Sequence, residues 1–312
     1  MQKIVIIGAG NVGGQAALFL LRDGFRDMLL LDVAKGLAKG KALDLEDCAS
    51  LLRQNCRIEG SDDFGLLKDA AIVIITAGLP RKPGMTRDDL LKKNSEILKG
   101  LSLKIKEFAP SAIVLVVTNP VDLMTHLVSE VTGFPKSRVF GMGVSLDAGR
   151  LANLVHQELN VPVNNVEASV IGSHGQTMVP VPSLTSVAGA RIERLMDKAI
   201  IGRLIQHTVE RGASIVAHLG SGSAYFGPAA AISDIVKSIA RDEKRIIPVC
   251  AYLNGEYGIK GIYLGVPARI GRDGVEGVIE LELDPPEKEA LLKSAESVRQ
   301  QTAGLTAFIT YV

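Results

Sequence analysis

The sequence predicts an α/β fold: a doubly wound parallel sheet over residues 1–141, followed by an α+β region over residues 142–312 that contains antiparallel sheet. Two observations predict it. In the first half, short apolar runs alternate with longer amphipathic segments, which is the pattern of right-handed βαβ units. In the second half, long helical patterns accompany three strand-like segments, two of which flank a glycine-containing turn.

Four apolar runs in the first half predict strands, because they lack the polar alternation of a half-exposed strand. They are Lys3–Ile7, Met28–Leu31, Ala71–Ala77 and Ala112–Val117. The amphipathic stretches between them predict three helices, Val12–Arg22, Lys39–Leu52 and Arg87–Phe108.

The pattern changes near Gly141, where no flexible linker marks the boundary. Beyond it the helical patterns are Leu146–Leu159, Lys198–Leu219, Ala230–Arg241 and a last helix that begins at Pro285-Pro286 and ends near Gln301. The strand-like segments are Ile246–Leu253, Lys260–Ile270 and Val275–Leu283, with Gly271–Gly274 as the turn between the last two. We therefore expect two domains, residues 1–141 and 142–312.

The composition limits the function classes. The chain has 312 residues, 47% of them hydrophobic, and a formal charge of +1, so nothing indicates a nucleic acid or a membrane as partner. Cys48, Cys56 and Cys250 show no C-x-x-C or Cys/His metal spacing, which indicates reduced thiols and no metal. The apolar runs are too short to span a membrane, and the first strand leaves no room for a targeting peptide. We expect a cytoplasmic protein.

A glycine motif follows the first predicted strand. Residues Gly8–Gly13 read GAGNVG, which matches G-x-G-x-x-G where a strand passes into a helix. The first glycine permits the tight turn, the second lets the backbone approach a pyrophosphate, and the third allows close packing of helix on strand. The helix N-terminus then offers free N–H groups to the phosphates. This context predicts a dinucleotide-binding Rossmann domain.

Asp32 ends the second predicted strand, 19 residues beyond Gly13. A carboxylate at that place accepts hydrogen bonds from the adenosine ribose and repels the 2′-phosphate of NADP. The cofactor predicted is therefore NAD. The alternative is a strand-to-helix turn with an incidental acid.

Three cations follow the third predicted strand, in the loop that reads GLPRKPGMTR from Gly78 to Arg87. Its prolines and glycines exclude a helix, and the carboxyl end of a central strand is where open α/β sheets bind ligands. Such a loop can close over a site and exclude water. The alternative is a solvated basic loop.

Asp147 and Arg150 share one face of a predicted helix, where a plain intrahelical ion pair is the alternative to a site. His174 lies between Gly172-Ser173 and Gly175 directly after a strand-like run, which presents its side chain at a sharp bend. Histidine suits acid–base chemistry near neutral pH, so His174 is the candidate general base. The other four histidines fall within helical patterns, where packing or surface roles are the default: His126, His156, His207 and His218.

Together these segments resemble the malate/lactate dehydrogenase family, in its lactate-dehydrogenase-like malate dehydrogenase branch. The resemblance runs from Lys3 to at least Ala230. Its carriers are Gly8–Gly13, Asp32, Pro80–Leu91 (PRKPGMTRDDLL), Thr118–Asp122 (TNPVD), Leu146–Arg150 and Gly172–Gly175. It implies reversible hydride transfer between malate and NAD, a tricarboxylic acid cycle role, and a homo-oligomer, either dimer or tetramer.

The resemblance also implies the roles of single residues. His174 is expected to exchange the proton and Asp147 to orient it. Arg150 would bind the C1 carboxylate of the substrate, Arg87 would polarise the reacting C–O bond, and Arg81 would hold the distal carboxylate. Asn119 would bind the substrate oxygen and the cofactor region, and Ser223 would line the pocket. The cofactor-binding residues implied are Gly8, Gly10, Asn11, Val12, Gly13, Asp32, Thr76, Ala77, Gly78, Asn94, Val117 and Asn119.

One position departs from the family pattern. Gln176 stands where the family usually has an aspartate, which puts the pKa of His174 in doubt but not its role. The nearest rival is a lactate dehydrogenase, which is expected to carry a neutral residue in place of Arg81. A catalytically idle NAD-binding protein would need a damaged site, and a hydrolase would need a G-x-S-x-G or metal motif that the sequence lacks.

Overall fold

The computed structural model describes residues 2–34, 36–79 and 87–305 and, in helix α3, side chains from Asp89 onward. In the first half the strands are β1 (Lys3–Ile7), β2 (Asp27–Leu31), β3 (Arg57–Ser61), β4 (Ala70–Ile75), β5 (Ile113–Val116) and β6 (Val139–Gly141). The helices are α1 (Asn11–Arg22), α2 (Leu37–Leu51), α3 (Arg87–Phe108) and α4 (Val121–Thr132). The sequence prediction missed β3, β6 and α4.

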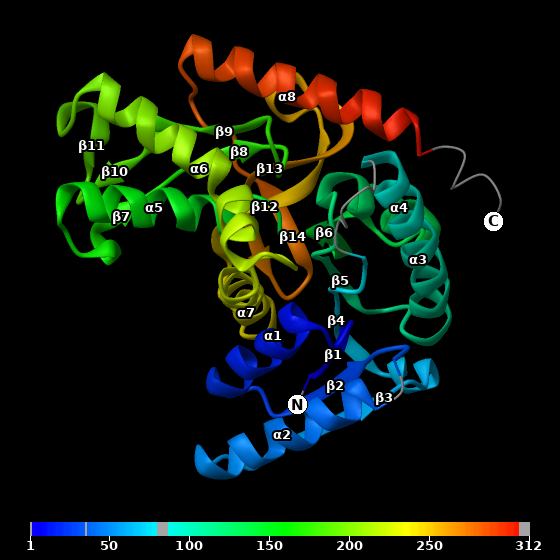
Figure 1. Cartoon of the computed structure of the whole chain (residues 1–312). Helices are drawn as coiled ribbons and strands as arrows, with labels where there is room; N and C mark the ends of the chain where they lie inside the picture. Colours follow the sequence, from blue (N-terminus) through cyan, green and yellow to red (C-terminus); the bar gives the residue numbers. More distant parts are fainter. Residues whose placement is uncertain (1, 35, 80–86, 306–312) are drawn as a thin grey trace.

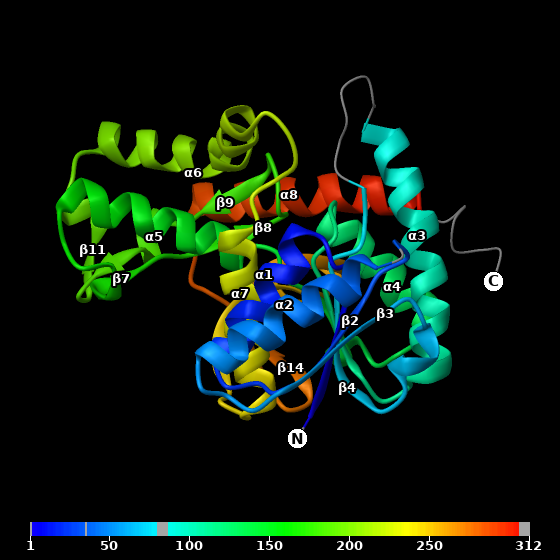
Figure 2. The same ribbon diagram turned by 60° about the horizontal axis from the view of Figure 1, so that its bottom comes forward.

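The second half contains helices α5 (Ser145–Leu159), α6 (Lys198–Leu219), α7 (Phe226–Ala240) and α8 (Pro285–Ala303). Its long strands are β12 (Arg245–Asn254), β13 (Lys260–Gly271) and β14 (Gly274–Val278). The short strands are β7 (Val166–Glu167), β8 (Val170–Gly172), β9 (Met178–Pro180), β10 (Ser186–Val187) and β11 (Ala190–Arg191). Helices α5 and α6 pack on each other beside the small sheet β11-β10-β7 in both views (Figures 1 and 2).

Among the described residues, eleven strands form one sheet in the order β3-β2-β1-β4-β5-β6-β12-β13-β8-β9, with β14 on β13. Strands β1 to β6 pair in parallel. The sheet turns antiparallel where Cys250 of β12 pairs with Gly141 of β6. The predicted fold class, a parallel Rossmann sheet followed by an α+β part with antiparallel strands, is confirmed.

Helices cover both faces of the parallel part (Figure 1). Ile4 and Ile6 of β1 point into one core with α1, α2 and α7, whereas Val5 and Ile7 point into the other with α3 and α4. Successive side chains of a strand face opposite sides, so an uninterrupted apolar run is what a doubly covered strand requires. This explains why these strands were visible in the sequence.

The prediction of a strand over Val275–Leu283 was wrong in its second half, because β14 ends at Val278. Beyond Ile279, a side chain takes the place of a partner strand. The hydroxyl of Tyr257 donates to the carbonyl of Ile279 at 3.0 Å and accepts from the N–H of Leu281 at 2.9 Å. These backbone groups are therefore satisfied without a ladder.

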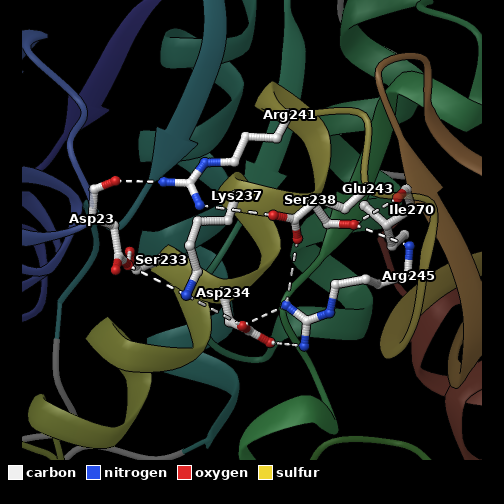
Figure 3. A network of polar contacts seen from close by, with 9 residues as sticks. All are labelled: Asp23, Ser233, Asp234, Lys237, Ser238, Arg241, Glu243, Arg245 and Ile270. Carbon is white, nitrogen blue, oxygen red and sulfur yellow. Dashed lines mark hydrogen bonds and ion pairs between the residues drawn. The ribbon is translucent and has the colours of Figure 1, made fainter.

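Helix α7 is fastened to the end of α1 by a polar network (Figure 3). Ser233 donates to the carboxylate of Asp23 at 2.6 Å, and the ammonium of Lys237 lies 3.5 Å from the same carboxylate. Arg245 makes two hydrogen bonds to Asp234, at 2.7 and 3.0 Å. Partly exposed pairs of this kind add little stability, so their main effect is to fix the orientation of α7 on the parallel half.

Candidate active site

The three glycines of the loop after β1 differ in what surrounds them. Gly8 has φ +106°, and a Cβ there would lie 2.5 Å from the N atom of Ala77. A Cβ on Gly13 would lie 1.9 Å from the carbonyl oxygen of Gly8. Gly10 has φ −65°, and a Cβ there would meet no described atom within 4 Å. The fold therefore requires glycine at positions 8 and 13, whereas position 10 leaves open space for a ligand.

We expect Gly10→Ala and Gly13→Ala to separate cofactor binding from folding. Gly13→Ala should lower the free energy of unfolding by about 2–3 kcal/mol or more, because backbone must move. Gly10→Ala should leave unfolding within about 0.5 kcal/mol of wild type but weaken NADH binding about tenfold or more. Chemical denaturation and NADH fluorescence titration measure the two effects. Unweakened NADH binding in a folded Gly10→Ala protein would contradict the assignment.

Asp32 lies directly after β2, beside the glycine loop. One carboxylate oxygen accepts the N–H of Ala9 at 2.7 Å, and the other accepts the N–H of Ala34 at 2.9 Å. Each oxygen keeps a lone pair that a ribose hydroxyl can use. Lys41 of α2 donates to the carbonyl of Gly10 at 2.7 Å and interacts electrostatically with Asp32. Nothing in the spacing of Lys41 marks it in the sequence.

The segments after β4 and β5 form the other edge of the site. Thr76 donates to the carbonyl of Gly8 at 2.8 Å, and a Cβ on Gly78 would lie 2.5 Å from Cγ2 of Thr118. Asn94 is 1% exposed; it accepts the N–H of Leu79 at 2.8 Å and donates to the carbonyl of Asn119 at 2.9 Å. Asn94 thus joins the two segments, and the side chain of Asn119 is exposed.

Asp147 contacts both His174 and Arg150, the other two residues of the candidate catalytic centre. One of its oxygens lies 2.6 Å from Nδ1 of His174, and the other accepts from Arg150 at 2.8 Å. The Asp147 side chain is fully buried, whereas His174 and Arg150 are 14% and 12% exposed. With Nδ1 held by the carboxylate, Nε2 is the nitrogen that remains to exchange a proton with a ligand. The intrahelical pair predicted as an alternative is real, but it also holds the histidine.

The surroundings of His174 act on its pKa in opposite directions. Burial of the ring lowers the pKa, but the carboxylates of Asp147 and Asp122 raise it by more, against a small opposing effect of Arg150. The net result is a pKa raised above its usual 6.5. The protonated imidazole therefore persists to higher pH than in a free histidine.

The remaining histidines lie in helices, as the sequence indicates: His126 in α4, His156 in α5, and His207 and His218 in α6. Nδ1 of His156 contacts the carbonyl of Val161, and Nδ1 of His218 contacts that of Ser214 at 2.8 Å. None of these rings contacts a carboxylate in the described part of the chain. Gly172 and Gly175, on either side of His174, therefore distinguished it in the sequence from the four histidines in helices.

Other predicted residues are placed less fully. Arg81 lies outside the described residues; Arg87 begins α3, and its side chain also lies outside them. Ser223 is exposed between α6 and α7, and Gln176 is exposed in the turn after His174. Among described residues neither makes a hydrogen bond. Asp122, the last residue of the TNPVD segment and not a predicted site residue, accepts the N–H of His174 at 3.0 Å.

In the described ranges no helix is long and apolar enough to cross a membrane. The same ranges contain no cluster of three His, Cys, Asp or Glu side chains that could hold a metal ion.

Comparison with known proteins gives two family models. The lactate/malate dehydrogenase NAD binding domain matches residues 2–141, and the lactate/malate dehydrogenase alpha/beta C-terminal domain matches residues 144–309. A malate dehydrogenase of Methanosarcina acetivorans is 44% identical over 96% of this chain and 98% of its own.

Solved structures agree. The apo malate dehydrogenase of Picrophilus torridus has a TM-score of 0.95 at 37% identity and covers 98% of both chains. A lactate dehydrogenase of Cryptosporidium parvum, complexed with lactic acid and NAD, has a TM-score of 0.94 at 34% identity and covers 98% of both chains.

Proposed function

Because this chain belongs to the lactate/malate dehydrogenase family, we propose that it is an NAD-dependent malate dehydrogenase, converting (S)-malate and NAD to oxaloacetate and NADH and back. The observation that supports this proposal most strongly is that the carboxylate of Asp147 is hydrogen-bonded to both His174 and Arg150. A proton-exchanging group and a carboxylate-binding group are thereby fixed on one buried anion, which suits a 2-hydroxy acid.

The glycine loop fits NAD, because position 10 is open while Asp32 is already held in place by two backbone donors. When bound, NAD supplies the acceptor for the hydride that leaves C2 of malate. In that step neutral His174 takes the hydroxyl proton at Nε2, and Asp147 stabilises the imidazolium that forms. Arg150 orients the C1 carboxylate through two parallel hydrogen bonds, a geometry that guanidinium groups favour.

The residues that bind the rest of the substrate are assigned from the sequence. Malate is a dianion, so both carboxylates need a partner in a site from which water is excluded. Arg81 takes the distal carboxylate, Arg87 polarises the reacting C–O bond, Asn119 binds the substrate oxygen, and Ser223 lines the pocket. The lactate dehydrogenases among the structural neighbours make lactate the second candidate, and Arg81 is the reason to prefer malate.

The protein acts in the tricarboxylic acid cycle, in the cytoplasm, which the three unpaired cysteines support. It assembles as a dimer or tetramer. The cofactor domain is residues 1–141, ending with the last parallel strand, and the substrate domain is residues 142–312.

Cofactor selectivity tests the role of Asp32. NAD should exceed NADP in kcat/KM by about tenfold or more, since ~1.4 kcal/mol of repulsion suffices for that factor. Asp32→Asn should narrow the gap, while Asp27→Asn, at the other end of β2, should leave it unchanged. Steady-state rates with both cofactors measure it. Equal kcat/KM for NAD and NADP in the wild-type protein would contradict the assignment.

The activity itself is tested by incubating the protein with (S)-malate and NAD. We expect absorbance of NADH to appear with oxaloacetate as the product identified by mass spectrometry. Formation of NADH from lactate but not from malate would replace this function by the second candidate. No NADH from either acid would exclude both.

A further inference from the structure

A second buried carboxylate lies beneath the acid–base pair. Asp122, in the first turn of α4, is 5% exposed. One of its oxygens accepts the backbone N–H of His174 at 3.0 Å, and the other accepts the thiol of Cys250, from β12, at 3.1 Å. Helix α4 starts two residues after Asn119. Asp122 therefore joins the expected substrate-binding segment to the turn that carries the histidine.

The His174 turn is held at two consecutive backbone N–H groups. The N–H of Ser173 donates to the hydroxyl of Ser294, from α8, at 2.9 Å, and Ser294 is fully buried. Gly172 before it has φ +83°, and a Cβ there would lie 2.9 Å from the same hydroxyl. The turn is thus fixed between α4 and α8, one N–H to each helix. Of the two groups that accept these N–H bonds, the Asp122 carboxylate and the Ser294 hydroxyl, only Asp122 can carry a charge.

The charges around the imidazole come from two helices. Helix α5 contributes Asp147 and Arg150, which form a 2.8 Å ion pair with each other. Helix α4 contributes Asp122, and β12 contributes Cys250, whose pKa burial raises so that it remains a neutral thiol. Helix α8 contributes the neutral Ser294. Among the described residues, Asp122 is therefore the negative charge at this site that has no cationic partner.

The contacts of Asp122 indicate its protonation state. Burial raises the pKa of this carboxyl group, whereas the thiol of Cys250 and the N–H of His174 oppose that rise. Both contacts are donated to the carboxylate, one to each oxygen. The net pKa of Asp122 is raised above its usual value, and the two donors, one to each oxygen, favour the ionised form against that rise.

We propose that Asp122 is a positioning residue for His174 that also favours the imidazolium through its unpaired charge, and so sets the pH at which reduction of the keto acid gives way to oxidation of the hydroxy acid. The proposal deepens the function proposed above and rests on it for the direction of the reaction. It assigns a task to a residue outside the His174–Asp147–Arg150 group.

Two variants separate the effect of the charge from that of positioning. Asp122→Asn keeps an oxygen that can accept the N–H of His174 but removes the charge. Ser294→Ala removes the other hold on the turn and leaves the charge. We expect Asp122→Asn to move the inflection of kcat/KM against pH to lower pH by about one unit, in both reaction directions. Ser294→Ala should lower kcat without moving the inflection.

A spectroscopic readout gives the same answer without catalysis. The ring signals of the five histidines are titrated by NMR, and the signal missing from His174→Asn identifies His174. Its midpoint should fall in Asp122→Asn by the same amount as the kinetic inflection. If Asp122→Asn does not fold, Cys250→Ala is used instead. Loss of the thiol donor disfavours ionised Asp122, so the midpoint should fall by a smaller amount.

The outcomes distinguish the two proposals. A midpoint that does not move in Asp122→Asn, or in Cys250→Ala where that variant replaces it, overturns the role of Asp122, whatever the substrate is. An equal shift in Ser294→Ala also overturns it, because the effect would then come from the turn and not from the charge. A wild-type protein inactive on malate and lactate but with the expected NMR shift would instead refute the proposed function alone.

Discussion

His174→Asn is expected to lower the rate of oxaloacetate reduction by about 10²–10⁴-fold while NADH still binds. Asparagine has no titratable group, so Asp147 would have nothing to orient and the substrate oxygen no proton donor. Stopped-flow or steady-state rates give the loss, and NADH fluorescence confirms binding. His207→Asn, an exposed histidine of α6, is the matched control and should keep wild-type rates. Near-normal turnover in His174→Asn would make His174 a structural residue.

The same histidine predicts the pH behaviour of the wild-type protein. Reduction needs the imidazolium, so its kcat/KM falls as pH rises through the pKa of His174. Oxidation needs the neutral ring, so its kcat/KM rises through the same pKa. Since the net effect of the surroundings raises that pKa, both inflections should lie above 6.5. Profiles that move together in the two directions would contradict the assignment.

Arg81→Gln is expected to shift substrate preference by about 10²–10³-fold. If Arg81 holds the distal carboxylate as proposed, its guanidinium pairs with that group in the oxaloacetate complex, whereas pyruvate presents a methyl group and leaves the charge unpaired. An uncompensated buried charge costs roughly 3–5 kcal/mol, and ~1.4 kcal/mol corresponds to tenfold. The variant should therefore lose kcat/KM on oxaloacetate and gain it on pyruvate.

Arg150→Gln is the contrasting variant, because both keto acids carry the C1 carboxylate that Arg150 is proposed to bind. It should impair both substrates by comparable factors. The measurement is kcat/KM of the wild type and both variants on both acids. If Arg81→Gln impaired both acids equally, Arg81 would not select the substrate, and malate would lose its main support over lactate.

The glycine loop could be predicted from sequence because its motif is contiguous and directly follows a buried strand. The clash that Gly13 avoids is local, with the carbonyl of Gly8, whereas Gly8 avoids the backbone of Ala77, which lies 69 residues away along the chain. The strands β1, β2, β4 and β5 were visible because both of their faces are covered. By contrast, β3 (Arg57–Ser61) carries polar residues on an edge strand, and β6 is three residues long, too short for a pattern.

The acid–base site depends on contacts that sequence distance hides. Asp147 and His174 are 27 residues apart, and their pairing was implied by the family resemblance, not by spacing. The contact of Asp122 with His174 spans 52 residues, and that with Cys250 spans 128. Helix α4, ten of whose twelve residues are buried, was also missed from the sequence. Only the fold brings these side chains together.

The central claim, a dehydrogenase that selects a dicarboxylate, is tested most directly by one ratio. The wild-type protein is given NADH with oxaloacetate or with pyruvate at the same pH, and kcat/KM is determined for each. The account predicts that oxaloacetate is preferred by about 10²-fold or more. A kcat/KM for pyruvate equal to or above that for oxaloacetate would contradict it.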